Sequence, residues 1–265
     1  MTRIRPAAVA GAFYPGATRE LEQTVREFLS EADSSARTVP PKALIVPHAG
    51  YIYSGPIAAT AYAQLSSIAD RIRRVVILGP AHRVPVEGLA LPDVDWFETP
   101  LGKVEVDKVP EIADLPQVGS NYYAHEEEHS LEVQLPFLQK VLREFKIVPL
   151  VVGRASPEEV AEVLERLWGG EETLIVISSD LSHYLPYADA QRTDQGTAKE
   201  ILTWEVPITH EQACGATPVN GFLVAAKKHD LTGELLDLRN SGDTAGDRRQ
   251  VVGYASFAFS KADGG

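Results

Sequence analysis

Four short runs of aliphatic residues constrain the fold of this chain more than any other feature of its sequence. They lie at residues 43–46 (ALIV), 75–78 (VVIL), 147–152 (IVPLVV) and 174–177 (LIVI). None of them alternates apolar with polar residues, as a strand with one face in water would. Strands that are buried on both faces have this pattern, which is typical of a mostly parallel sheet covered by helices. The runs therefore predict an α/β fold.

Amphipathic segments between these runs predict the covering helices. Residues 16–32 gather their apolar side chains on one helical face. Pro56 follows a Ser-Gly pair, and because proline is favoured in a first turn, a helix is expected to begin close to it. Ser156 can cap a helix, with Glu159 completing a capping box. A further helix is expected to begin at the Thr-Pro pair of residues 217–218.

The remaining stretches complete one α/β domain. Residues 88–108 combine short alternating pieces with turn residues and predict a β-hairpin. Residues 250–259 alternate weakly and predict an edge strand or a late strand of the sheet. No internal repeat or linker interrupts residues 1–265. We therefore expect a single domain whose mostly parallel or mixed central sheet is layered between helices.

Composition and charge argue against several classes of function. The net charge is -12 and no long cluster of Lys and Arg occurs, whereas a nucleic-acid-binding protein needs a basic face. No run approaches the roughly 20 apolar residues of a membrane helix. The N-terminal segment is broken by Pro6, Gly11 and Pro15 and makes a poor signal peptide. Cys214 is the one cysteine, so no internal disulfide can form, and a cytoplasmic location is expected.

Three of the aliphatic runs lead into a segment that carries a histidine. The first run leads to His48 and the second to His82. The fourth run leads to Asp180 and then His183. In open α/β sheets, ligands bind in the crevice beyond the carboxyl ends of the strands. If the strands are parallel neighbours, the three imidazoles converge on one crevice.

Two neutral imidazoles and one anionic ligand form a common mononuclear metal site. The residues leave two choices for the anion, which are Asp180 and the thiolate of Cys214. Cys214 lies just before a predicted helix, whose amide dipoles are expected to lower the pKa of the thiol. A single cysteine is equally well explained as a small buried apolar residue. A blue-copper site would need an axial group other than methionine, because Met1 is the one methionine.

The segment HEEEH, from His125 to His129, matches the H-E-x-x-H pattern of zinc metalloproteases. That pattern requires a helix buried beside the metal, and here it would bury two additional carboxylates. The acidic residues also precede a predicted helix, where they would oppose the helix dipole. The metalloprotease interpretation is therefore disfavoured.

Seven segments, in this order, resemble the motifs of the Memo family, whose prokaryotic members are often called AmmeMemoRadiSam system protein B. They are RPAAVAGAFYPG, PHAGYIYSG, LGPAH, EHSLEVQLPFLQ, SSDLSHY, CGATPV and GDRRQVVGYASF. The resemblance covers residues 5 to 259. It implies a fold similar to the class III extradiol ring-cleaving dioxygenases, which hold non-haem Fe(II) with two histidines and a carboxylate.

The resemblance also implies roles for individual residues. It places the metal ligands at His48, His82 and Cys214, so that a cysteine occupies the carboxylate position. It places His183, Asp180 and His129 on the polar wall of the same pocket, with His183, oriented by Asp180, as an acid/base. A thiolate ligand suits Fe(II), Cu(I) or Zn(II).

Two functions follow from the resemblance. The first is redox or dioxygenase-like chemistry on an unknown small molecule, with Fe(II) or copper as the expected cofactor and zinc as a third choice. The alternative is a non-catalytic module that binds a metal or a peptide in the inherited pocket. The naming of the prokaryotic members links them to a radical-SAM protein and an AMMECR-like protein as partners.

Overall fold

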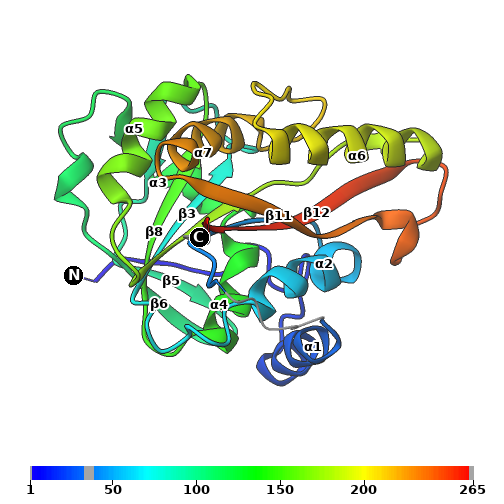
Figure 1. The fold of residues 1–265 in the computed structure, drawn as a ribbon. Helices are drawn as coiled ribbons and strands as arrows, with labels where there is room; N and C mark the ends of the chain where they lie inside the picture. The colour runs from blue at the N-terminus through cyan, green and yellow to red at the C-terminus, as the bar shows by residue number, and fades with distance from the viewer. Residues whose placement is uncertain (1, 33–38, 263–265) are drawn as a thin grey trace.

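A computed structural model of the chain describes residues 2–32 and 39–262. One sheet runs through the molecule, and helices cover both of its faces (Figure 1). The order of the strands along the sheet is β1-β5-β6-β8-β3-β9-β2-β12-β10. The chain is thus a single-domain α/β protein, as its aliphatic runs predict.

Four parallel strands form the centre of the sheet in the order β8-β3-β9-β2. They are β2 (Ala43–Val46), β3 (Arg74–Pro80), β8 (Lys146–Val152) and β9 (Thr173–Ser178). Each contains one of the four aliphatic runs. Because the strands are parallel, their carboxyl ends meet at the same edge of the sheet, and the loops that carry His48, His82 and Asp180 start from that edge.

The C-terminal strand makes the sheet mixed. This strand, β12 (Val251–Lys261), pairs antiparallel with β2 and also with β11 (Leu231–Asn240) and β10 (His183–Leu185). It is therefore a late strand, but it is not an edge strand. Its residues Val251 to Ser260 are almost all buried, because strands flank it on both sides and helices pack against it.

Short strands complete the other side of the sheet. The hairpin predicted in residues 88–108 is formed by β5 (Trp96–Thr99) and β6 (Gly102–Val106), which pair antiparallel. Ahead of it, β4 (Leu89–Leu91) pairs with β8 and with β7 (Val118–Ser120). The first strand, β1 (Ile4–Arg5), pairs parallel with β5.

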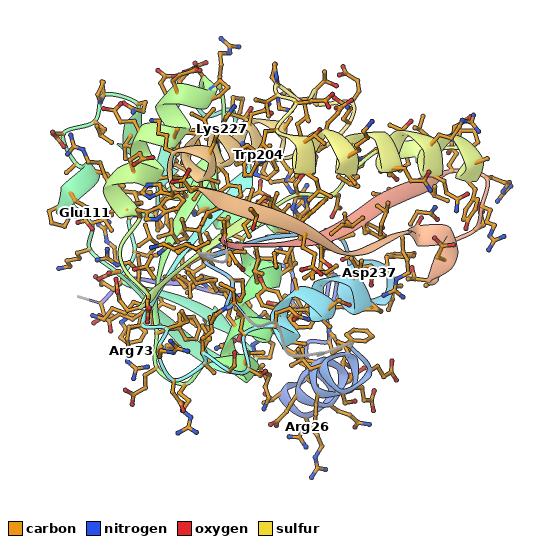
Figure 2. The ribbon with its side chains drawn as sticks, in the orientation of Figure 1. Arg26, Arg73, Glu111, Trp204, Lys227 and Asp237 are labelled. Atoms are coloured by element: carbon orange, nitrogen blue, oxygen red, sulfur yellow. The ribbon has the colours of Figure 1, made fainter. Side chains whose placement is uncertain are left out.

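One face of the sheet is covered by α1 (Thr18–Glu31), α2 (Tyr51–Ala63) and α4 (Leu135–Val141) (Figure 1). On α1, Arg26 projects outward into solvent (Figure 2). Helix α2 begins at Tyr51 rather than near Pro56, which lies inside the helix. The first turn of α2 therefore follows directly on the loop that carries His48.

The other face is covered by α5 (Pro157–Leu167), α6 (Tyr187–Thr203) and α7 (Ala216–Lys228) (Figure 1). The predicted capping box of α5 is present, with Ser156 and Glu159 bonding to each other's backbone N–H. Helix α7 begins within one residue of the predicted Thr-Pro pair.

Two apolar clusters hold these layers together, and successive residues of each strand contribute to opposite clusters. On β2, Leu44 and Val46 pack with α1, α2 and α4, whereas Ala43 and Ile45 pack with α5 and α7. This alternation is the reason why all four residues are apolar. Among the described residues, no helix combines the length and apolar composition needed to cross a bilayer.

Candidate metal centre

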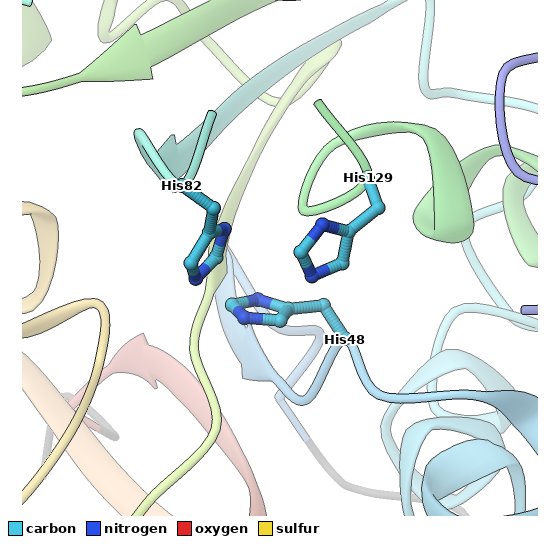
Figure 3. A group of neighbouring side chains, drawn as sticks. All are labelled: His48, His82 and His129. Atoms are coloured by element: carbon cyan, nitrogen blue, oxygen red, sulfur yellow. The ribbon is translucent and has the colours of Figure 1, made fainter. Parts of the chain in front are cut away.

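Three histidines meet at the carboxyl ends of the central strands. His48 follows β2, His82 follows β3, and His129 lies in the loop after α3 (Tyr122–Glu126). One ring nitrogen of each histidine lies within 4.8 Å of the corresponding atoms of the other two (Figure 3). The ring centroids of His48 and His82 are 5.1 Å apart, and those of His82 and His129 are 4.6 Å apart. Such a group of donors can hold a metal ion.

Hydrogen bonds fix the His48 ring with Nε2 unprotonated and in contact with Cys214. Its Nδ1 lies 2.9 Å from the hydroxyl of Ser178, the last residue of β9. That hydroxyl donates its one proton to the Ser130 carbonyl at 2.6 Å, so His48 Nδ1 must be the donor. Burial first, and then the charges of His82 and His129, lower the pKa of His48 well below its ordinary value. The imidazole is therefore neutral, and the Nε2 lone pair is available to a metal.

A buried carboxylate orients His82 in the same sense. Glu128 Oε1 lies 2.9 Å from His82 Nδ1, and Glu128 Oε2 accepts the His82 backbone N–H at 2.6 Å. Burial alone would raise the pKa of Glu128, but the hydrogen bonds from His82 and Ser130 and the charge of His82 hold it at about 2. The carboxylate is thus ionised and accepts the Nδ1 proton. A carboxylate behind a ligating imidazole is the usual support of a metal-binding histidine.

His129 completes the group from a different part of the chain. Its ring packs on Phe13 with a centroid separation of 4.5 Å. Its Nδ1 is buried and makes no hydrogen bond, although Glu128 Oε1 lies 3.4 Å away. Burial is the main cause that lowers the pKa of His129 to about 4. At neutral pH this ring is therefore an uncharged base.

Cys214 touches the group but lies outside it. Its Sγ is 3.2 Å from His48 Nε2, just before Gly215, the N-cap of α7. Burial first, and then the charge of Asp180, raise the pKa of Cys214 to about 12. The prediction that the helix would lower this pKa is wrong, because burial outweighs the helix terminus. The thiol is protonated at neutral pH, and its Sγ lies within hydrogen-bonding distance of both His48 Nε2 and the Asp180 carbonyl.

Asp180 is buried beside the group and is not one of its three members. Its Oδ1 accepts the His48 backbone N–H at 2.7 Å. This bond fixes the backbone of the loop that leads from β2 into α2. Burial is the main cause that raises the pKa of Asp180 above its ordinary value. The structure gives Asp180 a part in holding the His48 loop.

His183 stands apart on the exposed side of the site. It is the first residue of β10, and its Nδ1 lies 2.8 Å from the Leu181 carbonyl. This contact orients the ring, whereas Asp180 was the expected partner. His183, Asp180 and His129 line one cavity of about 800 Å³, whose lining does not include His48, His82 or Cys214. Aromatic rings also line this cavity, from Phe13, Tyr53, Tyr184 and Tyr254.

The sequence comparisons with known proteins match nearly the whole chain. The family model described as "Memo-like protein" matches residues 5–258. The chain belongs to the Memo family. A MEMO1 family protein of Aquifex aeolicus is 40% identical over 272 residues, covering 97% of this chain and 99% of the relative. MEMO1 family proteins of Methanosarcina barkeri and Archaeoglobus fulgidus are each 36% identical, with coverage of 96% and 97% of this chain and 99% of each relative.

A solved structure of an uncharacterized protein from Escherichia coli K12 aligns with 81% of this Memo-family chain and 98% of its own. The TM-score is 0.49 and the sequence identity is 14%. The α/β fold of this chain is established by its own strand pairing.

The HEEEH segment does not form the metalloprotease arrangement. Helix α3 ends at Glu126, so His129 lies beyond it in a loop. His125 is buried, and its Nε2 lies 2.8 Å from the Ala90 carbonyl. The two histidines therefore do not share a helix face, and only His129 reaches the three-histidine group.

Two acidic residues of this Memo-family site were missed by sequence reasoning, which assigned the acidic run to a helix dipole. Glu128 supports His82, as described above. Glu132 is fully buried and lies 2.5 Å from Arg5 Nη1, which is also fully buried. Both lie inside the segment EHSLEVQ, which carries the family resemblance. Their place in that segment was the sequence signal that could have identified them.

The Arg5–Glu132 pair ties the N-terminal segment to the histidine loop. Arg5 also donates to the carbonyls of His125 at 2.5 Å and Glu128 at 2.7 Å. Glu132 accepts the hydroxyl of Tyr14 at 2.5 Å. The pair thus holds the loop that presents Glu128 and His129.

A larger cavity of about 890 Å³ lies at the opposite ends of the strands. It is lined by Arg74 and Lys146, the first residues of β3 and β8. Their charges are already paired, with Asp107 at 2.7 Å and Glu105 at 2.8 Å. The cavity beside the histidines is therefore the better candidate for a functional site.

Proposed function

We propose that this Memo-family protein holds one metal ion through His48, His82 and Cys214 and carries out redox or dioxygenase-like chemistry on a small organic molecule. The observation that carries the proposal is the convergence of oriented imidazoles, with Nδ1 of His48 and of His82 each bonded away from the site. Neutral imidazole and thiolate are donors that Fe(II), copper and zinc accept. A bound Fe(II) or copper ion supplies one-electron redox chemistry, which these side chains cannot.

The contact between Cys214 and His48 supports a thiolate as the third ligand. Sγ lies 3.2 Å from the same Nε2 that is free for the metal, so one ion can contact both atoms after a small adjustment. Metal binding displaces the thiol proton, since the thiolate is the ligand form.

The lining of the 800 Å³ cavity supports an acid/base role for His129 and His183. Both line it, whereas His82 and Cys214 do not. His129 is uncharged at neutral pH and can accept a proton from a substrate. His183 is exposed, so it can exchange protons with solvent. The aromatic walls fit a substrate with an apolar or aromatic body.

The test uses untagged protein loaded with Fe(II), Cu(I) or Zn(II) without oxygen. We expect one ion per chain, its loss in His48→Ala and Cys214→Ser, and its retention in His129→Ala and His183→Ala. Oxygen uptake is then measured with catechols and other reductants, and the last two variants should lose turnover while keeping the metal.

Three outcomes would revise this assignment. Wild-type protein that stays empty would refute the metal site. Full affinity in Cys214→Ser together with loss in His129→Ala would replace the thiolate with a three-histidine ligand set. Stoichiometric metal without turnover on any reductant would favour the metal-binding or peptide-binding module.

A further inference from the structure

A second cavity reaches the metal centre from another side. It has a volume of about 410 Å³, and His82, Cys214, His210 and Thr217 are among its lining residues. It shares no lining residue with the 800 Å³ cavity that contains His129. The candidate centre therefore lies between two separate openings.

The two openings differ in chemistry. Four aromatic rings, of Phe and Tyr, line the larger one, which suits an organic molecule. The smaller one has no Phe, Tyr or Trp in its wall, and its functional groups include two imidazoles, a thiol and a hydroxyl. Arg154 adds a positive charge, but Glu87 lies 3.4 Å from it and offsets that charge. These groups suit a small inorganic cation better than an organic substrate.

The donors of the smaller cavity lie at different depths. His210 is exposed, and its Nε2 lies 3.4 Å from the Thr217 hydroxyl. The His82 side chain is 29% exposed, and Cys214 is half-buried. His48, in contact with the Cys214 sulfur, is only 2% exposed. A hydrated ion can therefore exchange its waters for protein donors one at a time as it moves inward.

We propose that this smaller cavity is the route by which the metal ion reaches and leaves the centre, with His210 as the first ligand that it meets. The inference rests on the proposed metal site and adds a residue and a path to it. His210 binds the ion only in passage, and His82 and Cys214 then take it over. The larger cavity is left to the organic substrate.

The test measures rates rather than activity, with Co(II) as the probe because its thiolate complex absorbs light. Metal-free wild-type and His210→Ala proteins are mixed with Co(II), and the bound ion is later removed with excess EDTA. We expect the rate of Co(II) binding and the rate of Co(II) removal both to fall roughly tenfold in His210→Ala, while the dissociation constant and the stoichiometry stay the same. A transient ligand lowers the barrier equally in both directions, so it cannot alter the equilibrium.

Matched variants separate the two openings. Thr217→Trp narrows the smaller cavity and should slow loading and removal in the same way as His210→Ala. Arg249→Ala and Gln250→Trp alter the larger cavity and should leave both rates unchanged. Because His210 and Gln250 are exposed, their substitution should not impair folding, and the circular dichroism of each variant checks this.

Each contrary result has a distinct meaning. Slower exchange in the larger-cavity variants, with normal rates in His210→Ala, would overturn the route. A weaker equilibrium affinity in His210→Ala would make His210 a permanent ligand and would also overturn it. If no variant, including wild type, develops the Co(II)–thiolate band, the failure belongs to the proposed metal site.

Discussion

At the scale of single residues, the centre depends on which nitrogen of each histidine carries the proton. Ser178 sets this for His48 because its only hydroxyl proton is committed to the Ser130 carbonyl. Glu128 sets it for His82 because its carboxylate can only accept. These two partners, which contact no ligand themselves, therefore decide where the lone pairs point.

Replacing Glu128 with Gln should weaken metal binding about 10-fold to 100-fold, the usual effect of losing such a supporting carboxylate. Gln keeps the shape but loses the charge that favours a metal-bound imidazole. The dissociation constant, measured by competition with a chelator of known affinity, checks the prediction. Glu127→Gln is the matched control, because Glu127 is adjacent and exposed. Equal affinities of the two variants would show that Glu128 is only structural.

At the scale of elements, the site is assembled from loops that follow three parallel strands and from one loop that the N-terminal segment holds. The strands give His48, His82 and Asp180 fixed starting points. The loop of His129 has no strand behind it. It relies instead on the buried Arg5–Glu132 pair and on Phe13.

Arg5→Met should lower the free energy of unfolding by about 3–5 kcal/mol, because it leaves the Glu132 carboxylate buried without its partner. The double variant Arg5→Met/Glu132→Leu should recover part of that loss, since no unpaired charge remains. Urea denaturation measures both.

Arg26→Met on α1 serves as the control for Arg5→Met. Its partner Glu22 is at the surface, and exposed pairs contribute little to stability. A loss of unfolding free energy in Arg5→Met as small as that in Arg26→Met would contradict the interpretation that the buried Arg5–Glu132 pair holds the histidine loop.

At the scale of the whole molecule, one ion would join segments that are far apart in the chain. The proposed ligands come from residues 48, 82 and 214, and they follow β2, follow β3 and precede α7. The unfolded chain cannot offer these donors together, so a metal ion binds the folded state preferentially.

Metal loading should therefore raise the melting temperature, and chelation should lower it again. At free metal about 1,000 times the dissociation constant, the gain is about 4 kcal/mol, or roughly 10 °C for a chain of this size. Differential scanning calorimetry of wild type and His48→Ala, each with and without metal, measures the effect. Only wild type should respond, and an equal shift in both proteins would place the ion elsewhere.

The central strands, the mostly parallel or mixed sheet and the positions of His48 and His82 after the strands were predictable from the sequence, whereas the order of the strands was not. Apolar runs, capping residues and turn residues act within a few positions of one another, so local pattern is enough to find them. The start of α2 was misplaced near Pro56, because the preference of proline for a first turn does not anticipate a helix that begins at Tyr51 and continues through the proline.

The choice between His125 and His129, the burial of Glu128 and Glu132, and the raised pKa of Cys214 were decided by the tertiary structure alone. Each depends on groups distant in the chain: Ala90 for His125, Arg5 for Glu132, and Asp180 for Cys214. Burial and charge act through space rather than along the chain. An identical run of Glu and His can therefore be a solvated helix end in one fold and the support of a metal centre in another.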